Sequence, residues 1–292
     1  MSERIDHTGF LNRLFVRFLR SVIQTPAGIK ALSISRYLYR PNLLDWVDTN
    51  HISIAISGLP REFDGYRLVQ ISDFHLGTWL NRNYLLDAVK QVNEQKPDLI
   101  AITGDFVTYH PEQFMDDLSA GVSRLSARDG IVAILGNHDH WTDPKIICQC
   151  LEQSGVSVLA NRIFSVRRDG ATLYMAGLDD MMVGKDDMCK ILSELPGEQK
   201  AILLAHEPDY AEISSKTSRF SIQLSGHAHG GQIILPRFGP LYLPSHARKY
   251  PTGLYNIDGM LLYSNSGLGT AELQFRYKSR PEIAVFTLKS VN

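Results

Sequence analysis

The sequence predicts a single α/β domain in which two mixed sheets pack into a sandwich, one more parallel and the other more antiparallel. Strand-like and helix-like stretches alternate from residue 51 to about residue 155, which is typical of right-handed crossover units around a parallel sheet. From Ser221 to the end, short strands with little helix dominate. The chain has 292 residues, of which 44% are hydrophobic, so it is long enough to bury a large core.

Residues 10–24 predict an amphipathic helix, because apolar residues recur on one face while Arg13, Arg17 and Arg20 fall on another. The segment is too short and too charged to span a bilayer, which takes about 20 mostly apolar residues. We expect it to bind in the membrane interface, helped by anionic lipid. Packing on the domain and cleavage as a targeting peptide are the alternatives. We therefore divide the chain into a membrane-associating segment, 1–48, and a folded domain, 49–292.

Hydrophobic periodicity locates the elements of the folded domain. Alternating residues at 51–57 predict a first strand, and continuous apolar runs at 68–71, 99–102, 131–135 and 201–204 predict buried strands. We expect helices at 81–95, 112–126 and 144–154. Asp169-Gly170 separates two further strand-like runs and predicts a hairpin.

Charge and cysteine content narrow the class of protein. Residues 1–40 carry seven basic and two acidic residues, a net +5, so the rest of the chain carries −6 of the total −1. A folded domain with this acidic balance does not suit a nucleic-acid partner. Three cysteines are too few for a disulfide framework and favour a reducing compartment, so we expect the protein at the inner face of the cell membrane. The sequence indicates no oligomeric state.

Five short polar blocks follow the predicted strands, and together they contain seven potential metal ligands. Because the carboxyl ends of buried parallel strands gather ligands at one edge of a sheet, these side chains are expected to converge. Turns and helix caps explain any single block equally well, but not the whole ordered set. The seven residues are Asp73, His75, Asp105, Asn137, His206, His227 and His229.

Two carboxylates, one amide and four imidazoles form a mixed oxygen and nitrogen set, which suits manganese, iron or zinc better than calcium. Seven ligands are too many for one ion that keeps a position open for water, and they suit two. Two divalent ions outweigh two aspartates, so the site favours an anionic, phosphate-containing substrate. A pair of such ions activates a water between them and clamps the oxygens of a displacement at phosphorus.

The sequence resembles the calcineurin-like metallophosphoesterases over about residues 50–288, through Asp-x-His, Gly-Asp, Gly-Asn-His-Asp, a lone His and Gly-His-x-His. The segments 230–232, 240–244 and 266–270 resemble a bacterial membrane-associated branch, which includes the UDP-2,3-diacylglucosamine diphosphatases. The resemblance implies a four-layer α-β-β-α sandwich and two divalent ions, for which we expect manganese first. It also implies a phosphohydrolase that cleaves a phosphodiester or pyrophosphate bond, and we expect a lipid-linked substrate.

The resemblance also implies the roles of individual residues. It places Asp73, His75 and His229 on one ion, places Asn137, His206 and His227 on the other, and makes Asp105 the bridge between them. His138 is implied as the group that protonates the leaving oxygen or stabilises charge on phosphorus. Many family members place an aspartate three residues after the bridging one to orient that histidine, whereas this chain has Thr108. For Asp139 we expect loop capping.

Weaker candidates and other functions are also open at this stage. Arg237, Arg248 and Lys249 follow the Gly-His-Ala-His block and are candidates for gripping a second phosphate. A soluble cyclic-nucleotide phosphodiesterase and a nuclease are alternatives within the same chemistry. A non-catalytic protein-binding scaffold is the alternative of another class, although such scaffolds have typically lost ligands that this chain retains.

Overall fold

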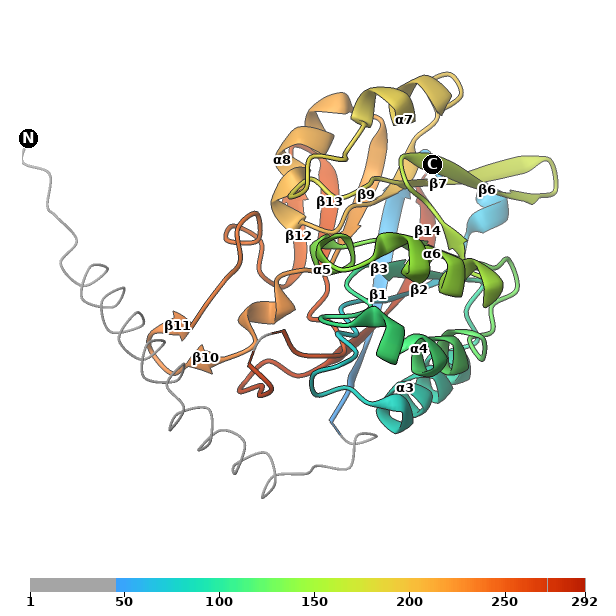
Figure 1. The fold of residues 1–292 in the computed structure, drawn as a ribbon. Coiled ribbons are helices and arrows are strands. Elements are labelled where there is room, and N and C mark those ends of the chain that lie inside the picture. The colour runs from blue at the N-terminus through green and yellow to red at the C-terminus, as the bar shows by residue number, and fades with distance from the viewer. Residues whose placement is uncertain (1–45, 272, 292) are drawn as a thin grey trace, which may run out of the picture.

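The computed structural model describes residues 46–271 and 273–291, and these residues form four layers in the order α-β-β-α (Figure 1). Two six-stranded mixed sheets face each other, and helices cover the outer side of each, so the predicted fold class is confirmed. The predicted amphipathic helix at 10–24 lies outside the described residues. No helix within 46–271 or 273–291 is long and apolar enough to cross a membrane.

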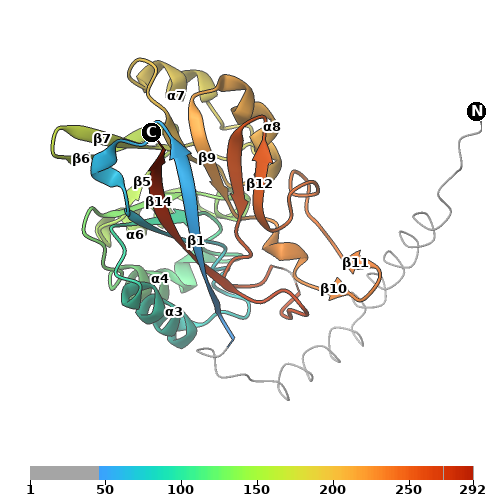
Figure 2. The same cartoon turned by 180° about the vertical axis from the view of Figure 1, so that it is seen from behind.

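The first sheet has the strand order β1-β14-β2-β3-β4-β5. All neighbouring strands are parallel except the β14 and β2 pair, which is antiparallel. Figure 2 shows the two longest strands, β1 and β14, running side by side at one edge. The strands are β1 (Asp48–Ser57), β14 (Glu282–Val291), β2 (Arg67–Ile71), β3 (Leu99–Thr103), β4 (Ile131–Ile134) and β5 (Ser157–Val158).

The second sheet has the order β12-β13-β9-β8-β7-β6 and, as expected, it contains more antiparallel pairs than the first sheet. Only the two outermost pairs are antiparallel, whereas the three inner pairs are parallel. The crossovers from β7 to β8 and from β8 to β9 use helices of only seven and four residues, α7 (Met188–Glu194) and α8 (Ala211–Ser214), too short to show a helical period in the sequence. The strands are β12 (Gly253–Ile257), β13 (Met260–Ser264), β9 (Phe220–Ser225), β8 (Ala201–Leu204), β7 (Ala171–Gly177) and β6 (Arg162–Arg168).

The helices of the first half lie close to their predicted positions. Asn81 and Asp143 cap α3 (Arg82–Glu94) and α6 (Pro144–Gln153) by accepting backbone N–H bonds, so both helices begin where the sequence signals them. The predicted helix at 112–126 is instead a 3₁₀ turn, η3 (Pro111–Gln113), followed by a shorter helix, α4 (Met115–Val122). A short helix, α5 (Asn137–Trp141), begins at the Gly-Asn-His-Asp block.

Short elements complete the chain. The hairpin of β10 (Ile234–Leu235) and β11 (Gly239–Pro240) stands apart from both sheets (Figure 2). The remaining 3₁₀ turns are η2 (Arg61–Phe63), η4 (Pro208–Tyr210), η5 (Ser215–Thr217) and η6 (His229–Gly231).

The core has three parts that follow the layers. The middle part lies between the two sheets, where Leu68 and Val132 of the first sheet pack with Ile202 and Leu224 of the second. A second part lies between the first sheet and α3, α4 and α6, and a third lies between the second sheet and α7 and α8. Because both faces of the central strands are covered, they are continuous apolar runs that end in polar residues.

Candidate metal centre

All seven predicted ligands meet at the carboxyl ends of five strands, and all are buried. Asp73 and His75 follow β2, Asp105 follows β3, and Asn137 opens α5 just after β4. The second sheet supplies the other three from the chain after β8 and β9: His206, His227 and His229. The site therefore lies across the edge where the two sheets meet, and both sheets contribute to it.

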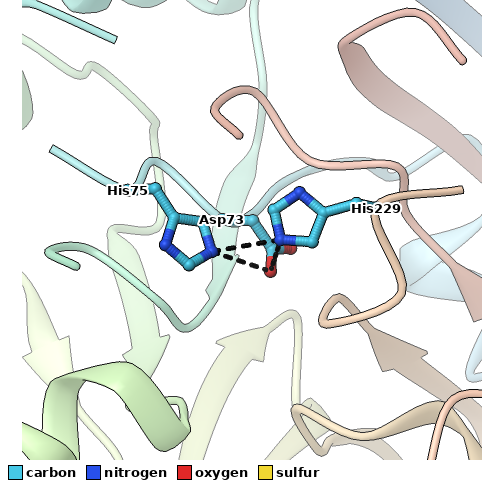
Figure 3. Close-up of side chains that lie close together, drawn as sticks. All are labelled: Asp73, His75 and His229. Atoms are coloured by element: carbon cyan, nitrogen blue, oxygen red, sulfur yellow. Dashed lines mark hydrogen bonds and ion pairs between the residues drawn. The ribbon is translucent and has the colours of Figure 1, made fainter. Parts of the chain in front are cut away.

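One group of ligand atoms surrounds Asp73. Its Oδ1 lies 3.9 Å from His75 Nε2 and 3.4 Å from His229 Nε2, and the two imidazole nitrogens are 3.0 Å apart. Figure 3 shows the three side chains pointing toward one another, Asp73 and His75 from the loop after β2 and His229 from the chain after β9. Two nitrogens and one carboxylate oxygen thus face a single point, as the ligands of one cation do.

A second group lies on the other side of Asp105. Its Oδ2 lies 3.2 Å from His206 Nε2, and His227 offers a further nitrogen within 4.8 Å of both atoms. The same Oδ2 lies 3.4 Å from His75 Nε2 of the first group. Asp105 therefore connects the two groups.

The donor set fits two divalent cations. The side-chain oxygen of Asn137 is buried beside this site and has no hydrogen-bond partner in the described part of the chain. A buried polar atom left without a partner costs about 1–3 kcal/mol, a cost that a cation at this position removes. Imidazole nitrogens mixed with carboxylate and amide oxygens suit manganese, iron and zinc.

Three of the ligand histidines are each oriented by a contact at the ring nitrogen that faces away from the site. Nδ1 of His75 lies 2.8 Å from the Thr108 hydroxyl, and Nδ1 of His206 lies 2.6 Å from the Thr103 carbonyl oxygen. Nε2 of His227 lies 2.9 Å from the Ser245 carbonyl oxygen. A neutral ring that donates its N–H on one side presents its lone pair on the other, toward the site.

The electrostatics of the buried site keep most ligands in their binding form. Burial lowers the pKa of His75 and His229, and it lowers that of His227 to about 3, so these rings are neutral. Burial acts to raise the pKa of Asp105, but the neighbouring His206 and His138 hold it well below its usual range. The connecting carboxylate is therefore ionised at neutral pH.

Strained backbone and close packing position the ligand loops. Asp73, His75, Asp105, His227 and His229 all have φ between 50° and 67°, a region that side chains other than glycine rarely adopt. Such strain gathers at functional sites because the surrounding structure compensates for it. Glycines of the same blocks allow the loops to approach closely: a Cβ at position 104 would lie 2.7 Å from the next block's backbone and 2.8 Å from His206.

Asp139 bonds to the backbone of the loop after β3 and of the start of α5, and this agrees with the capping role expected for it. Its carboxylate accepts four backbone N–H bonds, from Asp105, Phe106, Val107 and Gly136, at 2.9 to 3.2 Å. These bonds join the loop after β3 to the start of α5. Asp105 and Asn137 are thereby held in a fixed relation.

His138 lies at the boundary between the ligand cluster and solvent. Its backbone N–H donates to Asp105 Oδ1 at 2.9 Å, and its half-buried ring contacts the rings of His75 and Trp141. Thr108, at the position where many relatives carry an orienting aspartate, contacts His75 instead. Among the described residues, no carboxylate hydrogen-bonds to the His138 ring.

A cavity opens directly over the ligands. Its floor includes Asp105, Asn137, His138, His227 and His229, so the site is accessible to a substrate. Its walls are largely apolar and come from α5, from the loop after β7, from the long segment after β9, and from the segment after β13. The main apolar wall residues are Trp141, Met182, Ile233, Leu241, Tyr242 and Leu273.

The three basic candidates do not line this cavity. The Lys249 ammonium lies 2.6 Å from the carboxylate of Glu212, and the backbone N–H groups of Arg248 and Lys249 donate to Asp209. Arg237 is exposed in the turn between β10 and β11. A role for them in substrate binding stays a prediction.

Arg276 is a buried cation at the site that sequence reasoning missed. Its guanidinium donates to the carbonyl oxygens of Ser266 and Gly269, and one of its nitrogens lies 3.3 Å from Nδ1 of His229. Burial lowers its pKa to about 10, which leaves it charged at neutral pH. Its 47-residue separation from His229 offers no local signal in the sequence.

The chain is similar to several known proteins. The family model described as calcineurin-like phosphoesterase matches residues 66–231. The chain is 38% identical to the uncharacterized metallophosphoesterase YkuE of Bacillus subtilis, over 99% of this chain and all of that protein. It is 26% identical to the phosphodiesterase YaeI of Escherichia coli, over 76% of this chain and 82% of that one. A solved archaeal phosphodiesterase aligns with a TM-score of 0.39 and 13% identity, covering 69% of this chain and 84% of that chain.

Proposed function

The chain belongs to the calcineurin-like phosphoesterase family, and from this premise we propose that it hydrolyses a phosphodiester or pyrophosphate bond with the help of two divalent cations. The observation that carries the proposal is the position of Asp105, whose Oδ2 lies within 3.4 Å of a ligand nitrogen of each group. A carboxylate placed in this way is suited to two cations, and the cavity above it admits a phosphate.

In the proposed assignment, Asp73, His75 and His229 hold one cation, and Asn137, His206 and His227 hold the other. The grouping is supported by the two clusters of ligand atoms, which share Asp105. Two such cations, when bound, lower the pKa of a water molecule between them and neutralise charge on the phosphoryl oxygens. We propose manganese as the physiological metal, with iron and zinc as alternatives of similar ligand preference.

His138 is proposed as the group that gives a proton to the leaving oxygen or stabilises charge on phosphorus. The proposal is supported by its position, since its ring lines the cavity beside Asp105 and contacts the His75 ring. Asp139 fixes the backbone on which His138 stands, because it accepts the N–H bonds that join α5 to the loop after β3. These bonds hold the backbone of His138 in place beside the cavity, which favours a fixed position for its ring.

We further propose that the substrate is lipid-linked and met at the inner face of the membrane, with UDP-2,3-diacylglucosamine as an example. The apolar walls of the cavity support this proposal, since a lipid chain offers apolar surface that these walls can bury. The proposed membrane contact is made by residues 10–24, outside the described part. A soluble phosphodiesterase is the second candidate, and the similarity to YaeI favours it.

Metal content and turnover test the proposed chemistry. We expect wild-type protein to carry two manganese equivalents and to hydrolyse an aryl phosphodiester. His138→Ala is expected to keep both metals and lose roughly 10²–10⁴-fold in kcat, whereas Asp105→Asn is expected to lose metal and activity together. Asp143→Asn, which keeps a helix cap and does not line the cavity, is the matched control. One metal per chain in active protein, or full turnover by His138→Ala, contradicts the proposal.

Flotation with anionic liposomes tests the membrane part separately. We expect the full chain to float and a chain lacking residues 1–24 to remain in the dense fraction. Equal flotation of both chains rules out residues 10–24 as the anchor. Turnover of the substrate without any dependence on lipid or detergent favours the soluble phosphodiesterase.

A further inference from the structure

Trp141 is a large aromatic side chain left open to solvent beside the site. It is the last residue of α5, and 57% of its surface is exposed, although a ring of this size is ordinarily buried over most of its area. It also lines the cavity over the ligands. An apolar ring exposed inside a cavity offers binding energy to whatever covers it.

The position of this ring is tied to that of His138. The two residues are three apart on one helix, and their ring centroids are 4.9 Å apart with an angle of 61° between the planes. His140, between them in sequence, lies 2.7 Å from the Asp179 carboxylate, and the Thr142 hydroxyl donates to the His138 carbonyl oxygen. α5 is therefore fastened on both sides of Trp141.

The rest of the cavity wall continues the apolar surface that Trp141 begins. Met182 comes from the loop after β7, Ile233 and Leu241 come from the segment after β9, and Leu273 comes from the segment after β13. No lysine or arginine lines the cavity in the part of the chain that the structure describes. An anionic leaving group, such as a second phosphate, held against these walls and away from the cations would lose its solvation without gaining a lysine or arginine as a partner.

From these observations we propose that Trp141 and the adjoining apolar wall bind the leaving group, and that this group is an uncharged apolar alcohol. The proposal rests on the proposed function. His138 shows on which side of the phosphorus the leaving group lies only if His138 is the residue that protonates it. Hydrolysis forms a bond from the water oxygen to phosphorus and breaks the bond from phosphorus to the leaving oxygen. That oxygen takes a proton and departs as the alcohol. The proposal therefore selects the phosphodiester branch of the proposed function over the pyrophosphate branch, and it excludes UDP-2,3-diacylglucosamine, whose cleavage would release an anionic phosphate monoester.

Three phosphodiesters distinguish binding of the leaving group from binding of the group retained on phosphorus. The reference is methyl 4-nitrophenyl phosphate, in which the nitrophenol leaves. The second compound carries an octyl chain on the leaving ring, and the third carries the octyl chain in place of the retained methyl group. We expect wild-type kcat/KM to rise at least tenfold when the chain is on the leaving ring. We expect a change of less than threefold when it is on the retained side.

Variants of Trp141 assign the effect to this residue. Trp141→Ala is expected to remove most of the gain for the chain on the leaving ring, and Trp141→Phe is expected to restore part of it. Leu254→Ala is the matched control, because Leu254 is also exposed (47%) but lies on β12 outside the cavity. Thermal unfolding of each variant checks that the fold is intact.

A binding measurement keeps the proposal independent of turnover. Titration calorimetry with the product, the octyl-substituted nitrophenol, is run on chelator-treated protein at a pH below the pKa of the phenol, where this product is uncharged. We expect wild type and Leu254→Ala to bind it and Trp141→Ala to bind at least tenfold more weakly. If no diester is hydrolysed, the proposed function fails, and the calorimetry still tests the apolar subsite. The leaving-group proposal is overturned by equal binding to all variants, or by a Trp141→Ala loss confined to the chain on the retained side.

Discussion

Asp139→Asn tests whether one buried carboxylate holds the site together. In the folded protein its Oδ2 accepts the N–H groups of Asp105 and Gly136, and its Oδ1 accepts those of Phe106 and Val107. Asparagine has the same shape but only one oxygen. Its NH₂ group therefore faces two N–H donors that lose their acceptor.

The expected loss of stability follows from these bonds. Two stranded buried donors cost about 1–3 kcal/mol each. Burial and the nearby Asp105 charge raise the pKa of Asp139 to about 7, against the lowering by the N–H donors, so the buried charge is itself costly. Removing that charge offsets part of the loss, and we expect a net decrease of about 2 kcal/mol in the free energy of unfolding.

Urea unfolding of chelator-treated protein measures this quantity without any contribution from bound metal. Asp143→Asn is the control, since asparagine caps a helix as well as aspartate does and the N–H groups of Lys145 and Ile146 remain near solvent. A difference below about 0.5 kcal/mol between the two variants would refute the account of Asp139 as the organiser of these loops.

Other residues give further predictions. Gly226→Ala places a Cβ against the Asp73 carboxylate, so we expect a folded protein that binds less metal. Elemental analysis measures the metal content, and an unchanged content contradicts the packing argument. Iodoacetamide at pH 8 is expected to alkylate exposed Cys189 first, because burial raises the pKa of Cys148 to about 11; peptide mass spectrometry reads the order, and faster labelling of Cys148 contradicts it. Burial also raises the pKa of Glu207 to about 8, above its value in the unfolded chain. Between these two pKa values the folded state holds a proton that the unfolded state releases. The free energy of unfolding is therefore expected to fall as the pH rises from about 5 to 8. Glu207→Gln should flatten that fall in urea titrations of chelator-treated protein, and an unchanged pH profile excludes this carboxyl as its source.

Local patterns in the sequence were sufficient for the parts of the structure that depend on neighbouring residues. A buried parallel strand is apolar along its length and is followed by polar residues where the chain leaves the sheet. The ligand blocks after β2, β3, β4 and β8 can therefore be recognised from the sequence alone. Caps set the start of α3 and α6 for the same local reason, since Asn81 and Asp143 bond to N–H groups two and three residues ahead.

Tertiary structure alone decided what depends on distance between residues far apart in the chain. The parallel pairing inside the second sheet, the guanidinium of Arg276 beside His229, and the Thr108 contact to His75 leave no local pattern. Closeness in sequence does not ensure closeness in space either. Lys249 follows the Gly-His-Ala-His block by only 20 residues, yet it does not line the cavity and instead forms an ion pair with Glu212. Sequence periodicity reports which face of an element is buried, whereas a binding site is a set of distances between atoms that only the packed layers bring together.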